Sequence, residues 1–200
     1  MNPLKTVAGT IIGGVVLAVV IALATMGVNF NVGSFVVWIH VLAGITWIGL
    51  LYYFNFVQVP ALADAAGDEG GPGGAGITKY VAPRALWWFR WGAALTWLSG
   101  AAYLYILGIL HHAFTLGLTE GGNNSHMLIG VGAWLGTIML FNVWVLIWPN
   151  QKKILGMVEA SADQIAKART IAFTASRTNT LLSIPMLMSM VGYGHGGFFL

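Results

Sequence analysis

The sequence predicts an all-α membrane protein with five transmembrane helices, on three grounds: composition, apolar runs and the placement of basic residues. Of its 200 residues, 58% are hydrophobic and 8% are charged, and the mean hydropathy is +0.79. A typical water-soluble domain has about 25% charged residues. The composition therefore excludes an ordinary soluble enzyme and indicates that the chain folds in lipid.

Five apolar runs are each long enough to cross a hydrocarbon core, which takes roughly 20 helical residues. They cover about residues 7–28, 34–57, 84–110, 126–148 and 178–198. The first run follows Lys5 as a signal peptide would, but it is longer than a signal core of about 7–15 residues. We interpret it as a retained helix. We expect a single membrane domain over residues 1–200, in which helices two to five form a four-helix core and the first packs at its edge.

A sixth helix is predicted over about residues 151–176, before the last span. Its apolar positions Ile154, Val158 and Ile165 lie near one helical face and are flanked by basic side chains. This pattern is typical of an interfacial helix that lies on the membrane surface.

The basic residues predict the orientation in the membrane. Five alternating spans place all nine Lys and Arg on one side, whereas four spans would divide them between both sides. They are Lys5, Lys79, Arg84, Arg90, Lys152, Lys153, Lys167, Arg169 and Arg177. The positive-inside rule makes that side cytoplasmic. We therefore expect a cytoplasmic N terminus and a periplasmic C terminus, and we attribute the pI of about 9.3 to this membrane face rather than to nucleic-acid binding.

The same topology places all five histidines toward the outer side: His40, His111, His112, His126 and His195. An imidazole at a helix end commonly bonds to water or backbone. His40 differs because it lies inside an apolar span, where an ionisable group usually has a partner or a function. Imidazole is a common haem ligand. The sequence thus predicts a non-covalent haem b on His40, with the opposing imidazole from His126 or, alternatively, from His112 or His195.

The residues that follow His40 also fit a flat cofactor. Gly44 allows close approach of a helix or a macrocycle, and Trp47 offers an aromatic surface for packing. Both residue types equally suit ordinary helix packing, so the pattern supports a haem site without establishing it. Gly44 and Trp47 complete the predicted cofactor-binding set.

A second group of polar residues lies nearer the cytoplasmic ends of the helices: Asn55, Gln58, Arg90 and Asn142. One interpretation is a pocket for a planar anionic or quinone-like substrate, in which the Arg90 guanidinium supplies a bidentate donor fork. The other is that the amides join helices and the cations extend toward the surface. The sequence identifies no catalytic residue.

Two further functions remain open from the residues alone. Met186, Met188 and Met190, followed by His195, offer soft ligands for copper, although residues two apart diverge on a helix. Alternatively, the chain is an accessory or structural subunit of a respiratory membrane complex.

Four stretches carry a resemblance to a known family: WIHVLAGITWIGLLYYFNFVQVPAL, APRALWWFRWGAALTWLSG, LGTIMLFNVWVLIWPNQKK and SRTNTLLSIPMLMSM. Together they resemble the membrane-embedded N-terminal domain of the bacterial urate oxidase family that carries a C-terminal cytochrome c. More distantly, the second helix and His126 resemble the copper-resistance D type and membrane protoporphyrinogen oxidase families.

The resemblance implies an oxidoreductase, or a subunit of one, in the bacterial inner membrane. Electrons would pass through haem b to a cytochrome c on the outer side, within a larger membrane complex. The chain has no cysteine, so it cannot attach a c-type haem by the usual two cysteines. We therefore expect the cytochrome to be a separate subunit or domain.

Overall fold

The computed structural model describes residues 2–197, except for the side chain of Glu120, and these residues form helices and no strand. The chain divides into two compact units, one ending at Val32 and the other beginning at Gly33.

The first unit consists of a short 3-10 helix, η1 (Pro3–Lys5), and the apolar helix α1 (Val7–Met26). The Thr6 hydroxyl caps α1 by accepting a hydrogen bond from the Gly9 amide at 3.0 Å. Such a cap satisfies one of the amides that the first turn of a helix leaves free. Gly27, at a φ of 78°, ends the helix.

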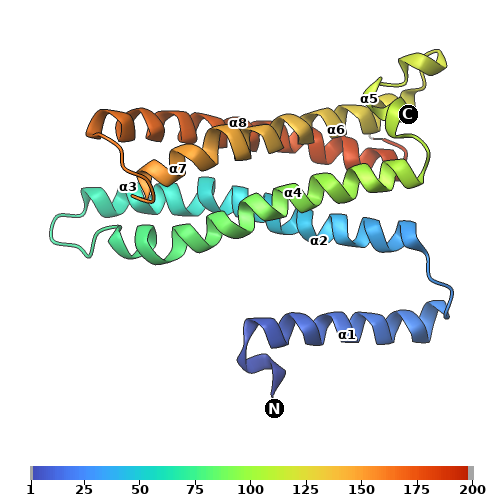
Figure 1. The fold of residues 1–200 in the computed structure, drawn as a ribbon, viewed down its shortest axis with the longest axis horizontal. Coiled ribbons are helices and arrows are strands. Elements are labelled where there is room, and N and C mark those ends of the chain that lie inside the picture. Colours follow the sequence, from blue (N-terminus) through green and yellow to red (C-terminus); the bar gives the residue numbers. More distant parts are fainter. Residues whose placement is uncertain (1, 198–200) are drawn as a thin grey trace. The chain divides into compact units, whose positions relative to one another are not determined.

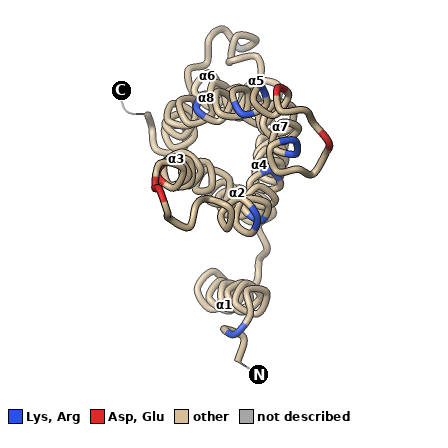
Figure 2. Tube along the Cα trace, turned by 90° about the vertical axis from the view of Figure 1, so that its left-hand side faces the viewer, with Lys and Arg blue, Asp and Glu red and all other residues tan. Residues whose placement is uncertain are grey.

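The second unit is built from four long helices that run side by side (Figure 1). In chain order its elements are α2 (Val32–Tyr53), η2 (Phe54–Gln58), α3 (Val59–Gly67), η3 (Ile77–Val81), α4 (Ala82–Ile106), α5 (Leu110–Phe114), η4 (Leu118–Glu120), α6 (Asn124–Phe141), η5 (Asn142–Ile147), α7 (Trp148–Ile154) and α8 (Ala162–His195). The segments η2, η3 and η5 are π-helices that join their neighbours into continuous helices. Viewed end-on, α2, α4, α6 and α8 surround the bundle axis (Figure 2).

A proline lies two residues after the end of each of the three π-helices: Pro60, Pro83 and Pro149. Proline has no amide hydrogen, and its ring crowds the carbonyl four residues earlier. That carbonyl lies inside the π-helix in every case. We attribute the three π-helices to this mismatch, because a wider turn gives the proline ring room without ending the helix.

The structure differs from the prediction of a separate interfacial helix over residues 151–176. A turn interrupts this segment, and residues 162–176 form the first half of α8, which continues through the last apolar run. A capping box explains the restart: the Ser161 hydroxyl accepts from the Gln164 amide, and the Gln164 side chain accepts from the Ser161 amide. Ala168 and Ala172 are buried, so this half of α8 packs against the bundle.

Polar side chains lie inside the second unit and apolar side chains cover its outside. The buried polar residues are Asn55, Gln58, Thr96, Ser99, Asn142, Asn179, Ser183 and Ser189. On the outside, large apolar side chains are exposed on every long helix, such as Leu98 on α4 (59%), Phe141 on α6 (55%) and Leu181 on α8 (67%). Apolar surface on this scale is typical of contact with lipid.

Three helices are long and apolar enough to cross a membrane: Val7–Met26, Val32–Gly67 and Asn124–Ile154. The other two predicted spans fall in α4 and α8, which have sufficient length. Both carry more charged and polar residues, including Arg84 and Arg90 in α4. The all-helical membrane character is thus supported, and the number of five spans is not confirmed.

Basic residues and histidines occupy opposite halves of the second unit. Six of its eight Lys and Arg lie toward the end formed by α3, α7 and the start of α8, here called the basic half. Its five histidines lie toward the other end, the histidine half. His126 and Lys152 begin and end one continuous helix and are separated by about 39 Å along it. Arg90 and Arg177 lie close to the middle.

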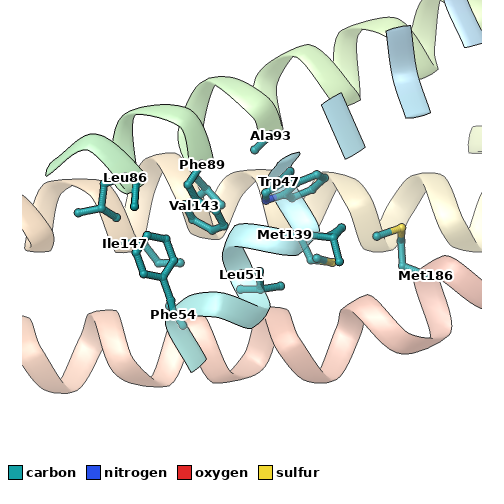
Figure 3. Packing of buried hydrophobic residues seen from close by; sticks show 13 residues of the cluster. Trp47, Leu51, Phe54, Leu86, Phe89, Ala93, Met139, Val143, Ile147 and Met186 are labelled. Atoms are coloured by element: carbon teal, nitrogen blue, oxygen red, sulfur yellow. The ribbon is translucent and has the colours of Figure 1, made fainter. Parts of the chain in front are cut away.

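The centre of the bundle is a cluster of large apolar side chains from all four long helices (Figure 3). Trp47, Leu51, Phe89 and Met139 are almost fully buried within it. Helices α2 and α4 come close at Gly92, where an added Cβ would lie 3.4 Å from the Trp47 amide nitrogen. A small residue is therefore needed at this crossing.

We predict that Asn179→Ala destabilises the bundle by about 1–3 kcal/mol, the usual result of leaving buried polar partners unpaired. The Asn142 amide donates to the Asn179 side chain at 2.8 Å, and the Asn179 amide donates to the Met139 carbonyl at 3.0 Å. Thermal unfolding of the purified protein measures the effect. Asn150→Ala is the control, because within the described residues this side chain bonds only to the Leu146 carbonyl, one turn earlier on the same helix. Equal melting temperatures for the two variants would contradict the prediction.

Candidate functional site

The His40 imidazole is held in one orientation by α4. Its Nδ1 lies 2.8 Å from the Thr96 carbonyl oxygen. Because a carbonyl only accepts hydrogen bonds, Nδ1 carries the hydrogen and the neutral ring keeps its lone pair on Nε2. The ring also lies against Gly100, where an added Cβ would be 2.9 Å from Cε1. Only glycine admits the ring there without displacement.

Unfilled space lies in the interior near the level of His40. Gly136 on α6 is buried, yet an added Cβ would meet no atom of another helix and no nearby side chain within 4 Å. The Trp97 indole donates to the Thr137 hydroxyl at 2.8 Å, which places Gly136 about half a turn from the level of Gly100 along the bundle. The histidine half thus has room beside α6 that no described side chain fills.

Two buried polar groups make no hydrogen bond to the described residues: Trp47 Nε1 in the central cluster and Ser189 Oγ nearer the histidine end. Trp47 follows His40 by two helical turns and shares its face. Ser189 lies beside Gly132 of α6, where an added Cβ would be 3.2 Å from the Ser189 Cβ. Buried polar groups are normally paired. A bound molecule would supply the missing partners.

The other histidines lie nearer the end of the bundle. The His112 ring stacks on the His126 ring, with centroids 5.4 Å apart and an angle of 13°. His195 is exposed, and its Nδ1 donates to the Val191 carbonyl at 3.0 Å. His111 is also exposed and lies edge-on to His112.

The helix register separates His40 from these histidines. The hydrogen bond between Trp97 and Thr137 marks one common level on α4 and α6. With a rise of 1.5 Å per residue, Gly100 beside His40 lies about 4.5 Å from this level toward the histidine end. His126 lies about 16 Å from the same level in the same direction. Gly132 of α6 lies beside Ser189 of α8, so the rise along α8 from Ser189 places His195 at about the same level as His126. The structure therefore does not bring His40 opposite His126, His112 or His195. Within residues 2–197, no three His, Cys, Asp or Glu side chains gather as a metal site.

The three methionines considered for copper do not converge. Met186 is buried in the central cluster and Met188 is exposed. Met190 packs on a second cluster near the histidine end. Met186 and Met190 are four residues apart and share a face of α8, whereas Met188, two residues from each, lies on another face.

A cavity of about 530 Å³ lies in the basic half of the bundle. Its polar lining comes from several elements: Asn55 and Gln58 of η2, Thr78 of η3, Gln151 of α7, and Arg169 and Ser176 of α8. The Asn55 amide is fixed by donating to the Ser176 hydroxyl and to the Leu51 carbonyl, both at 2.8 Å. Each of the three π-helices thus contributes to the wall, since Ile147 of η5 completes it. Irregular turns of this kind are frequent at functional sites.

Two of the four residues predicted for a substrate pocket lie outside this lining. The Arg90 guanidinium stacks over the Trp148 ring at 3.8 Å, and its buried Nη1 has no hydrogen-bond partner in the described chain. Asn142 is engaged with Asn179. Asn55 and Gln58 do meet at one cavity, together with Arg169 and Ser176, which the sequence analysis placed on the membrane surface. The capping box at Ser161 is the signal that α8 begins early enough to bring them into the bundle.

A repeated pattern relates α2 to α6. The spacing W-x-G-x4-F-N occurs at residues 47–55 and again at 134–142. In both copies the asparagine lies in a π-helix before a proline, and in both its amide donates to α8. This repeat identifies Asn55 and Asn142 as equivalent positions that fix α8 against the two helices.

Comparison with known protein families gives one match. Residues 109–199 match the family model described as urate oxidase N-terminal. This supports the predicted relationship to that family over the segment from α5 to the end of α8, whereas His40 and the rest of α2 precede it. No curated protein and no solved structure is significantly similar to the chain.

We predict that Gly100→Ala breaks the hydrogen bond between His40 and Thr96, because the new methyl group would force the ring away from α4. Imidazole ¹⁵N resonances of the purified protein report this bond. Overpacking of this kind costs about 1–3 kcal/mol. Gly49→Ala is the matched control on α2, since an added Cβ meets nothing within 4 Å there. Unchanged His40 resonances in Gly100→Ala would refute the contact.

Proposed function

We propose that this chain, which over residues 109–199 is a urate-oxidase-like membrane protein, binds haem b and passes electrons to a cytochrome c at its histidine half. The observation that carries the proposal is the orientation of His40. A ligating histidine typically donates its other ring hydrogen to a carbonyl or carboxylate, which fixes the ring and raises its basicity. The Thr96 carbonyl does this for His40.

Three features near His40 support a haem. Nε2 keeps its lone pair, an added Cβ at buried Gly136 would meet no neighbouring side chain, and Ser189 offers an unpaired hydroxyl to a bound molecule. A bound haem iron would supply one-electron chemistry at this position. The protein's part is to hold the His40 ring, to surround the group with apolar side chains and to keep water away.

The proposal assigns His40 as the one protein ligand, in place of the predicted pair with His126. Two imidazoles can hold one iron only if they come close together, and His126 lies about 12 Å farther toward the end of the bundle by the helical rise. His112, His126 and His195 then belong to the surface that faces the cytochrome.

The membrane arrangement is part of the proposal. The helices α1, α2–α3, α4, α6–α7 and α8 cross the bacterial inner membrane, and the exposed apolar side chains on α4 and α8 support their inclusion. The positive-inside rule puts the basic half in the cytoplasm and the C terminus in the periplasm.

A second candidate is an accessory subunit of a respiratory membrane complex. It is favoured by one observation: the family match lies after α2 and α4, so it does not include His40, Thr96 or Gly100. An accessory subunit would contain no haem of its own.

We predict that His40→Gly abolishes haem absorption, and that added imidazole restores it by occupying the vacated position. His126→Ala and the exposed control His111→Ala should keep full haem content. Absorption spectra of the purified variants, oxidised and dithionite-reduced, measure this. Rescue by imidazole separates a lost ligand from a misfolded bundle. Retention of haem in His40→Gly, or its loss in His126→Ala, would contradict the assignment.

We predict that cysteines at the two ends of the bundle react from opposite sides of the membrane. The chain has no cysteine, so His111→Cys and Lys167→Cys each carry one thiol at an exposed position. A membrane-impermeant maleimide should label His111→Cys in spheroplasts and Lys167→Cys only after the membrane is opened. Labelling of both in intact spheroplasts would refute the topology.

A further inference from the structure

We infer that the cavity in the basic half binds an amphipathic hydroquinone, with its hydroxylated ring inside and its apolar tail toward α3 and α8. His40 does not line this cavity, so ligand binding there does not require a haem on His40.

The strongest evidence is the Gln58 side chain. It is 8% exposed, it lines the cavity, and its Oε1 is enclosed without a hydrogen-bond partner in the described chain. A buried amide without partners is unfavourable, so an occupant that pairs with it is expected. A hydroxyl group donates and accepts, and it therefore satisfies the Gln58 amide whichever way its oxygen and nitrogen are assigned.

The rest of the lining suits a neutral ring. Phe54 and Phe89 meet edge to face, with centroids 5.4 Å apart, and Leu86 and Ile147 lie beside them (Figure 3). On the polar side, the amide of Gln151 and the hydroxyl of Ser176 lie within the same lining. The lining contains no carboxylate. The volume of about 530 Å³ is in the range of small-molecule sites, about 300–1,000 Å³.

The cavity reaches the surface between α3 and α8. Ala66 on α3 and Phe173 on α8 line it and are exposed, Phe173 by 49%. Large exposed apolar side chains such as Phe173 belong to the lipid-facing surface of the bundle. A ligand with an apolar tail can therefore keep its ring at Gln58 and its tail against this surface.

Within the described part of the chain, Arg169 is the one cation at the rim of the cavity, and it distinguishes an acidic ligand from a neutral one. Arg169 lines the cavity, is exposed and has no ion-pair partner among the described residues. A fatty acid would place its carboxylate at Arg169, because a guanidinium pairs with carboxylates in bidentate geometry. A neutral hydroquinone depends on Gln58 instead.

Isothermal titration calorimetry measures the affinity of the full-length protein, in lipid nanodiscs, for a decyl hydroquinone under reducing conditions. We expect saturable binding that Gln58→Leu weakens about tenfold or more, the factor for loss of one well-formed hydrogen bond. Thr170→Val, next to Arg169 but outside the lining, should bind as the wild type does. Arg169→Gln should leave hydroquinone binding unchanged.

The thermal stability of Gln58→Leu without ligand shows whether the variant still folds. Without ligand, the leucine variant should be at least as stable as the wild type, because it removes an unpaired buried amide. Absence of hydroquinone binding to the wild type would overturn the inference, as would equal binding by Gln58→Leu. Binding of laurate with dependence on Arg169, and none of the hydroquinone, would also overturn it. His40→Gly should still bind the hydroquinone, so failure of the haem proposal is distinguishable.

Discussion

The pairing of polar groups inside the bundle determines the rest of the structure. A bilayer core offers no water, so each interior polar group must bond to another part of the protein. The amides of Asn55 and Asn142 both donate to α8, and the Trp97 indole joins α4 to α6. These bonds fix the register of the long helices. The register in turn decides which side chains share a level, and so which residues can form a site.

A few buried polar atoms have no hydrogen-bond partner among the described residues, whereas most buried polar side chains do. These few atoms therefore indicate where a bound molecule could supply the missing partner. Ser189 Oγ lies in the histidine half, and Gln58 Oε1 faces the cavity of the basic half. Two separate regions of one small bundle thus contain polar atoms that lack a partner in the protein. The central cluster of Leu51, Phe89 and Met139 lies between them and closes the interior. We interpret the two regions as one site for a cofactor and one for a lipid-soluble ligand.

Much of the fold could be predicted from the sequence, since apolar runs identify helices by length and composition. The runs correspond to α1, α2, α4, α6 and α8, and His126 and Lys152 lie at opposite ends of one helix, as predicted. The site was less predictable. Side-chain position along a helix follows from the sequence, but the offset between helices follows from contacts such as Trp97–Thr137. For this reason His40 and His126 share an end of the bundle without sharing a level. The early start of α8 depended on a local signal, the Ser161–Gln164 capping box, which an apolar-run analysis does not weigh.

On this interpretation, the interior of the histidine half holds a haem b on a single imidazole. Resonance Raman spectroscopy of the reduced wild-type protein, purified from cells supplied with haem, measures both the haem content and the coordination of the iron. A single His40 ligand predicts stoichiometric haem b in a five-coordinate, high-spin state with an iron–histidine stretching band. Protein without haem, or with a six-coordinate low-spin haem held by two imidazoles, would refute it.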